Sequence, residues 1–215
     1  MNSTFISILN WSEVWALLIP LLALVARPKQ PKYLKPVIIY LCVAFPLNLI
    51  CDILSDYNDA HRDQLISNNP LYNMHSIVRF ACFSYFFILF KQKFFKPTSY
   101  FLSAIYIAFL GINFIFLENF FYKYNISGNL LSMEALLLLI YCMLYYLSQL
   151  KSEMEGITAT KGFWIVTGLS IYVAANFFVF LFYVPMITEN PTLANNMWNV
   201  HNVAYILLCI FISKA

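Results

Sequence analysis

The chain has 215 residues, of which 61% are hydrophobic and 11% are charged, and its formal net charge is +3. Because soluble proteins carry about 25% charged residues, this composition excludes an ordinary soluble domain and indicates an integral membrane protein. The basic residues stand in short gaps between apolar runs, so they act as topology signals and give no reason to expect nucleic-acid binding. The partner to expect first is the lipid bilayer.

Seven apolar runs follow one another along the chain, at about residues 8–26, 37–54, 71–90, 100–117, 130–150, 163–184 and 197–212. Each run is close to the roughly 17 to 25 residues that cross a hydrocarbon core as a helix. None shows the period-two alternation of a membrane β-strand. The sequence therefore predicts an all-α, polytopic membrane protein, in which residues 1–215 form a single bundle of seven transmembrane helices.

Basic residues alternate between the two sides of this predicted bundle. Ten of the 13 Lys and Arg residues lie in the first, third and fifth gaps and in the C-terminal tail, whereas only Arg62 and Lys123 lie on the opposite side. Since Lys and Arg are enriched in cytoplasmic loops, we expect the N-terminus outside and the C-terminus inside. The gaps are too short for a soluble domain, so a signalling output is expected to pass through a separate partner.

His75 and Arg79 are the costliest residues in these runs, because they lie one helical turn apart inside the third. At 1.5 Å of rise per residue, they would lie roughly 6 Å and 12 Å below the outer boundary of the membrane. Ionisable groups at such a depth usually face a bundle interior, a watery cavity or each other. The pair is therefore our starting hypothesis for a functional site.

Further polar side chains fall in the outer half of the predicted helices or near their middle: Asp52, Glu134, Asn176, His201 and Asn202, with Tyr72 on the face of His75. The inner half is nearly all aliphatic and aromatic. This asymmetry predicts an outward-facing polar pocket, in which Arg79 pairs with Asp52 or Glu134. The alternative is that these residues only hold the helices together, as buried polar networks often do.

A metal site is a sharper alternative, because two imidazoles and two carboxylates are a permissible ligand set for zinc: His75, His201, Glu134 and Asp52. Such a site would make the protein a metal-dependent intramembrane lipid hydrolase. Against it, the histidines lie on different helices without a HExxH motif, and Arg79 would repel a cation. We therefore expect no catalytic residue, no metal and no cofactor.

Three stretches carry a resemblance: NPLYNMHSIVRF in the third run, KGFWIVTGLSIYVAANFFVF in the sixth and MWNVHNVAYILLCIFI in the seventh. With them the chain resembles uncharacterised seven-helix inner-membrane proteins of Gram-negative bacteria, which are similar to the membrane sensor regions sometimes joined to histidine kinases. The resemblance implies a multi-pass protein of the bacterial inner membrane.

These observations favour a non-enzymatic sensor-like or accessory subunit. Its outward polar pocket would bind a small-molecule ligand or a segment of a membrane or periplasmic protein partner. The lipid hydrolase described above is one alternative. A structural subunit of a larger membrane protein complex, docked through the polar cluster, is the other.

Overall fold

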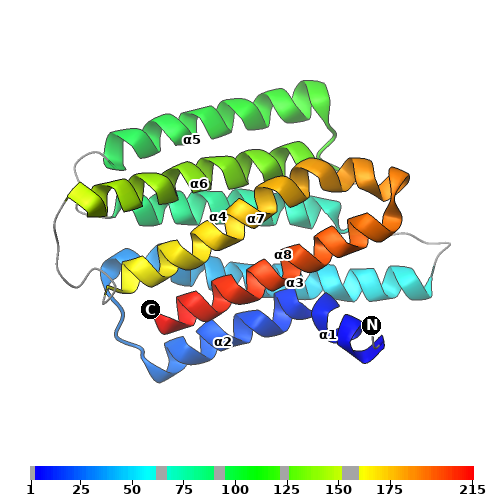
Figure 1. The fold of residues 1–215 in the computed structure, drawn as a ribbon, viewed down its shortest axis with the longest axis horizontal. Helices are drawn as coiled ribbons and strands as arrows, with labels where there is room; N and C mark the ends of the chain where they lie inside the picture. Colours follow the sequence, from blue (N-terminus) through cyan, green and yellow to red (C-terminus); the bar gives the residue numbers. More distant parts are fainter. Residues whose placement is uncertain (1–2, 62–66, 90–94, 122–125, 152–159) are drawn as a thin grey trace.

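The computed structural model describes residues 3–61, 67–89, 95–121, 126–151 and 160–215, which are helical and contain no strand. The helices are α1 (Ser3–Asn10), α2 (Ser12–Ala26), the 3₁₀ turn η1 (Lys32–Leu34), α3 (Lys35–Ala60), α4 (Asn69–Ile88), α5 (Phe95–Ile112), the π-helical turn η2 (Asn113–Leu117), α6 (Gly128–Lys151), α7 (Lys161–Glu189) and α8 (Pro191–Lys214). In chain order, the seven apolar runs fall on α2 to α8 (Figure 1). The prediction of an all-α chain is confirmed.

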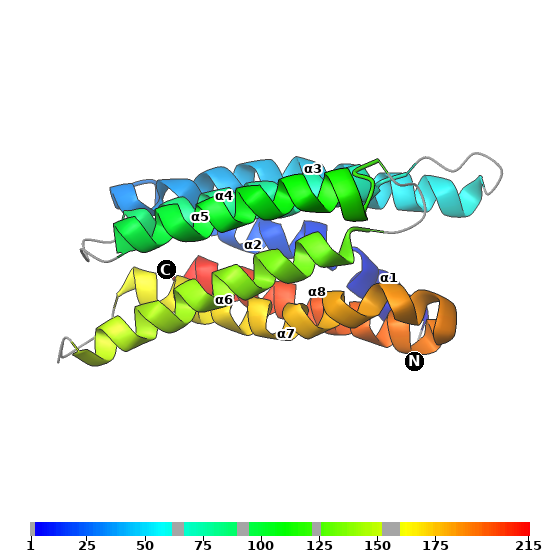
Figure 2. The same ribbon diagram turned by 90° about the horizontal axis from the view of Figure 1, so that it is seen from above.

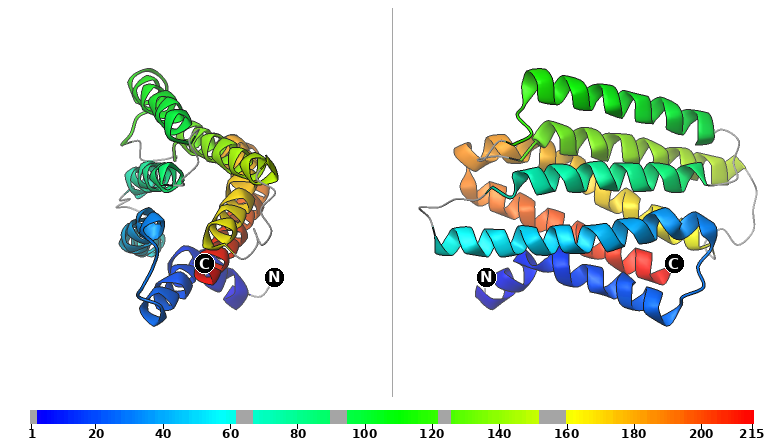
Figure 3. Two further views of the ribbon diagram at one scale, coloured as in Figure 1. Left: turned by 90° about the vertical axis from the view of Figure 1, so that its left-hand side faces the viewer. Right: turned by 180° about the vertical axis from the view of Figure 1, so that it is seen from behind.

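The long helices lie in two layers (Figures 2 and 3). One layer holds α3, α4 and α5, and the other holds α6, α7 and α8. Helix α2 closes one edge by contacting both α8 and α3, while α4 contacts α6 across the layers. We call the end that holds α1 and the α7–α8 corner the N-terminal end, and the end that holds the last residue the C-terminal end (Figure 1).

Within the described residues, five helical segments are long and apolar enough to cross a membrane: Lys32–Asn58, Phe95–Leu117, Gly128–Leu150, Lys161–Glu189 and Pro191–Lys214. Helix α2 is apolar but has only 15 residues. Helix α4 has 20 residues, but its Asn, His, Ser and Arg side chains make it less apolar than these five. The structure thus has five helices that suit a bilayer where the sequence predicts seven spans.

The first apolar run is the one whose prediction as a single helix is wrong. Helix α1 ends at Asn10, and α2 begins at Ser12 after a break at Trp11. The indole of Trp15 donates a 2.8 Å hydrogen bond back to the carbonyl of Ile8, across the break. Because α2 starts inside the bundle, its first two residues are buried. The second of them is a glutamate.

Helices α7 and α8 meet at a tight corner at the N-terminal end. Helix α7 runs on to Glu189, past the predicted end at residue 184, and α8 begins at Pro191, six residues before the predicted start. The side chain of Asn190 caps α8 by accepting a 3.1 Å hydrogen bond from the backbone N–H of Leu193. Proline suits the first turn of a helix because its missing N–H would have no partner there.

The core between the layers is aromatic towards the C-terminal end. Its fully buried side chains include Phe83, Phe86, Phe87 and Phe95. The rings of Phe87 and Tyr141 stack with centroids 4.9 Å apart and planes 7° from parallel, which joins α4 to α6. The polar groups buried between the layers lie on other turns of the same helices. They form the candidate site.

Candidate binding site

A buried ion pair joins α4 to α6. Arg79 Nε lies 2.5 Å from Glu134 Oε1, and its Nη2 donates to Oε2 at 2.7 Å. The third guanidinium nitrogen, Nη1, donates to the hydroxyl of Tyr172 on α7 at 2.6 Å. The sequence allows Asp52 or Glu134 as the partner of Arg79, and in the structure the partner is Glu134. The two-pronged geometry is the strongest that guanidinium and carboxylate form.

The carboxylate of this pair also has a second donor. Ser76, one turn before Arg79 on α4, donates to Glu134 Oε2 at 2.6 Å, and the hydroxyl of Tyr106 on α5 lies 3.4 Å from the serine oxygen. Arg79 and Glu134 are 3% and 1% exposed, respectively. The positive charge of the guanidinium is therefore compensated inside the protein.

A second ion pair joins α8 to α2. His201 Nε2 lies 2.9 Å from Glu13 Oε1, and its Nδ1 lies 2.6 Å from Asn176 Oδ1 on α7. The amide nitrogen of Asn176 donates to the backbone carbonyl of Tyr172 at 2.8 Å, so this pair is connected to the first. Both imidazole nitrogens face oxygen acceptors.

Glu13 is the functional residue that the sequence prediction missed. It lies at the start of the first apolar run, where an acidic residue ordinarily belongs to the membrane surface. The break at Trp11 instead turns it into the bundle, where it is 4% exposed. One signal could have found it, because an acidic residue inside an apolar run is as costly against lipid as Arg79 is.

His75 belongs to a chain of hydroxyl groups. Its Nε2 lies 3.2 Å from the hydroxyl of Tyr40 on α3, which lies 3.4 Å from the hydroxyl of Tyr205 on α8. Asn48 donates to Tyr205 at 3.2 Å and to the backbone carbonyl of Glu13 at 3.0 Å. The chain thus links α4, α3, α8 and α2 with neutral hydrogen-bonding groups.

A small cavity lies between these groups. It is lined by Glu13, Tyr72, His75, Arg79, Leu131, Phe180, Trp198, His201 and Tyr205, and its volume is about 10 Å³. A cavity of that size holds about one water molecule. The structure therefore brings four of the predicted residues to one space, but the space is too small for an organic ligand.

A larger polar recess lies beside this cavity at the N-terminal end, and we call it the vestibule. It is lined by Asn10, Trp11, Glu13, Asp52, Ser55, Asp56, Tyr72, Tyr183, Asn195 and Trp198, and its volume is about 240 Å³. Glu13, Tyr72 and Trp198 line both spaces. The vestibule and the small cavity therefore share a boundary made of three side chains.

Two predicted site residues lie away from the ion pairs. Asp52 is in the wall of the vestibule, 9% exposed, and its Oδ2 has no hydrogen-bond partner among the described residues. Asn202 is completely buried on α8, and neither its amide oxygen nor its nitrogen has a partner in the described part of the chain. Asn202 lines neither the vestibule nor the small cavity.

The four residues of the alternative metal site, His75, His201, Glu134 and Asp52, do not come together as one ligand set. Glu134 binds Arg79, His201 binds Glu13 and Asp52 lies in the vestibule. Across the described ranges, no three His, Cys, Asp or Glu side chains are close enough to hold a metal ion. The four residues proposed from the sequence therefore do not form a metal centre in this structure.

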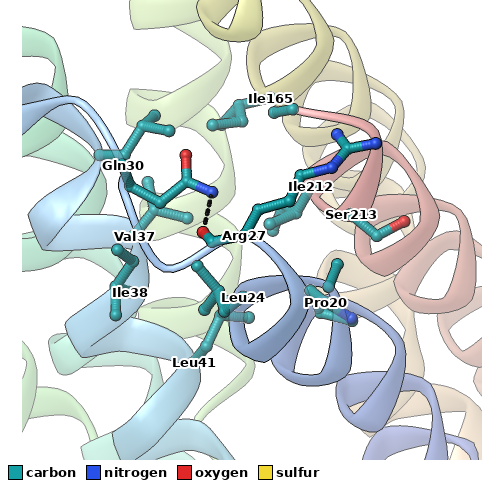
Figure 4. A pocket seen from close by; sticks show the side chains of 13 residues that line it. Pro20, Leu24, Arg27, Gln30, Val37, Ile38, Leu41, Ile165, Ile212 and Ser213 are labelled. Atoms are coloured by element: carbon teal, nitrogen blue, oxygen red, sulfur yellow. Dashed lines mark hydrogen bonds between the residues drawn. The ribbon is translucent and has the colours of Figure 1, made fainter.

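A different cavity lies at the C-terminal end, between α2, α3 and α8. Figure 4 shows Leu24, Ile38 and Leu41 around it, with the Arg27 side chain extended towards Ser213. Its volume is about 30 Å³. Gln30 at its rim donates to the backbone carbonyl of Arg27 at 2.8 Å. No carboxylate side chain lines this cavity in the described part of the chain.

Comparison with protein-family models, with curated proteins and with solved structures found no match for this chain. The site is therefore interpreted from its own geometry. That geometry is a polar vestibule of about 240 Å³ that adjoins, through the small cavity, a network of two ion pairs.

Proposed function

We propose that the protein is a non-enzymatic membrane protein with seven spans, a sensor-like or accessory subunit of the bacterial inner membrane that binds a small ligand in the vestibule. The N-terminal end of the bundle faces outwards, so the ligand arrives from outside the cell membrane. Ligand binding then changes the network of hydrogen bonds and ion pairs next to the vestibule, and this change is transmitted to a partner protein.

Charge distribution supports this orientation. The described basic residues other than Arg79 all lie at the C-terminal end: Arg27, Lys29, Lys32, Lys35, Lys96, Lys151, Lys161 and Lys214. Arg62 and Lys123, which the sequence assigns to the other side, lie outside the described residues. Because Lys and Arg are enriched in cytoplasmic loops, the C-terminal end is the cytoplasmic one in this proposal.

Packing supports counting α4 and α2 among the spans. The polar residues that lower the hydropathy of α4 point into the bundle, where His75, Ser76 and Arg79 are all buried. Because these side chains do not face lipid, they add little to the free-energy cost of placing α4 in a membrane. Helix α2 is about 22 Å long at 1.5 Å per residue. Helix α1 continues it beyond the break at Trp11, towards the N-terminal end.

One observation carries the proposal: the vestibule shares Glu13, Tyr72 and Trp198 with the cavity above the ion pairs. A ligand in the vestibule touches Glu13 on α2, which contacts His201 on α8 and through it Asn176 on α7. His75 is hydrogen-bonded to Tyr40, and His201 lies between Glu13 and Asn176. Glu134 is held by Arg79 and Ser76. This engagement favours binding and signalling over catalysis.

The proposal is tested by thermal unfolding of the purified protein in uncharged maltoside micelles, with a panel of small cations, anions and neutral solutes. A ligand at 100 times its Kd stabilises the folded state by about 2.7 kcal/mol. We expect at least one class to raise the unfolding midpoint of the wild type but not of Trp198→Ala. Val203→Ala, on a lipid-facing surface of α8, should respond like the wild type. If none of the solute classes raised the unfolding midpoint of the wild type, the proposal would be overturned.

A further inference from the structure

We propose that the ligand of the vestibule is a small organic ammonium compound, an inference that rests on the vestibule being the ligand site. The structure offers such a cation three things in one recess: uncompensated carboxylate charge, a buried carboxylate oxygen without a partner, and a wall of aromatic rings.

The charge of the vestibule is negative. Three carboxylates line it, and only Glu13 has a basic side chain beside it, the imidazole of His201. Asp52 and Asp56 lie one helical turn apart on α3, and neither takes part in an ion pair within the described residues. None of the described lining residues is a lysine or an arginine. A cation therefore finds a favourable field there, whereas an anion is repelled.

Asp52 is an unusual member of this group, because it is more than nine-tenths buried while its Oδ2 has no hydrogen-bond donor. A buried carboxylate oxygen without a donor is unfavourable, since it has lost its water and gained nothing in return. An ammonium group in the vestibule would supply the missing charge. A primary amine would also supply N–H donors.

Aromatic side chains form the rest of the wall. Trp198 lies edge-on to Tyr72, with ring centroids 5.8 Å apart, and packs against Tyr183 with centroids 5.0 Å apart. Trp11 lines the same recess from the break between α1 and α2. Aromatic faces beside carboxylates bind alkylammonium groups through the ring quadrupole. The combination is therefore selective for an organic cation over a hydrated inorganic one.

Other ligand classes fit less well. An anion would need a free cationic group, but Arg79 is held by Glu134 and His201 is held by Glu13. A metal ion would need three donors together, which the described residues do not offer. The ammonium group could belong to a free amine or to a lipid headgroup, since both carry the same chemistry.

The test is titration of the purified protein with choline, followed by tryptophan fluorescence, because Trp11 and Trp198 line the vestibule. The matched probe is the neutral isostere of choline, in which a tert-butyl group replaces the trimethylammonium group. We expect saturable binding of choline and at least about tenfold weaker binding of the isostere.

Asp52→Asn keeps the shape of the side chain and removes its charge. Because the trimethylammonium group of choline has no N–H to donate, its attraction to Asp52 is that of charge alone, so the variant should weaken choline binding at least about tenfold. Asp56→Asn should weaken choline binding less. Because Asp56 is exposed, this variant tests the carboxylate charge even if Asp52→Asn does not fold. Glu189→Gln removes an exposed charge at the same end without touching the vestibule. It should bind choline like the wild type.

Two arms separate the sources of the ammonium group. In nanodiscs of phosphatidylglycerol alone, choline should bind as it does in micelles. If nanodiscs that contain phosphatidylethanolamine abolish choline binding, the occupant is a lipid headgroup; if they leave it unchanged, the occupant is a free amine. Both results support the inference.

Equal affinities for choline and its isostere, or unchanged binding in both Asp52→Asn and Asp56→Asn, would overturn the inference. The proposed function would still stand if an anion or a neutral solute raised the unfolding midpoint of the wild type but not of Trp198→Ala. It would fail together with the inference only if no class of solute did so.

Discussion

The two ends of the bundle carry cavities of opposite character. The vestibule at the N-terminal end is lined by three carboxylates and four aromatic rings, whereas the cavity at the C-terminal end is lined mainly by aliphatic side chains with Arg27 at its rim (Figure 4). Helices α2, α3, α7 and α8 contribute to both. Their sequences therefore change character along their length, from packing residues at one end to interacting residues at the other.

This difference teaches where function is to be expected. Buried aromatic and aliphatic groups at the C-terminal end gain free energy by leaving water or lipid contacts for close packing, so they need no ligand. Buried charges at the N-terminal end are costly unless they are paired. Arg79 is paired with Glu134 and Glu13 with His201, but Asp52 has no such partner among the described residues. The unsatisfied group lies at the end that we propose to face outwards.

The largest expected effect concerns the sides of the membrane. Ser55→Cys, at the N-terminal end, should be labelled by a membrane-impermeant maleimide in intact cells, while Pro28→Cys, at the C-terminal end, should be labelled only after the membrane is opened. Both positions are exposed, and neither substitution changes the charge. The unsubstituted chain sets the background from its five cysteines. The opposite labelling pattern would reverse the orientation.

The next effect concerns the buried pair beneath the vestibule. Glu134→Gln leaves the Arg79 charge buried without a counter-ion, which typically costs about 3 to 5 kcal/mol. Chemical unfolding in mixed micelles should show this loss. The double variant Arg79→Met, Glu134→Leu should regain much of it, because hydrophobic replacement of a buried pair is often neutral. A single variant as stable as the wild type would mean that the pair contributes nothing to the fold.

Part of this site is predictable from the sequence. The cost of burying Arg79 predicts an acidic partner on another helix, and depth along the helices limits the choice to Asp52 and Glu134. The helical fold follows from the length of the apolar runs. Depth also predicts that His75, His201 and Tyr72 approach one another near Arg79, and all four line the small cavity.

Other parts depend on details that no run of residues records. The break at Trp11 decides that Glu13 points inwards and becomes the partner of His201. Side-chain packing decides that the space beside His75 and Arg79 holds only about one water molecule, so the room for a ligand lies further out. Helix α4 is not among the five helices that suit a membrane by length and composition, because its polar side chains lower its mean hydropathy. Those side chains are buried inside the bundle.

A smaller effect is expected at the C-terminal end, where α7 and α8 approach closely. A Cβ at Gly168 would lie 2.5 Å from the Cβ of Phe211, so the helices must separate to admit it. Gly168→Ala should therefore destabilise the protein by about 1 to 3 kcal/mol in the same unfolding experiment. Gly111→Ala is the matched control, because a Cβ there meets nothing within 4 Å. It should be neutral or stabilising by up to about 1 kcal/mol.

The smallest effect is expected at the α7–α8 corner, beside the vestibule. Asn190→Ala removes the side-chain cap on the N–H of Leu193 and should cost about 1 kcal/mol. Asn196→Ala is the control, since it is the same change at an exposed position of α8 and removes no cap. If both variants unfold at the same point, Pro191 and the packing of α8 hold the corner without the cap. If only Asn190→Ala also weakens choline binding, the corner positions Trp198 for the ligand.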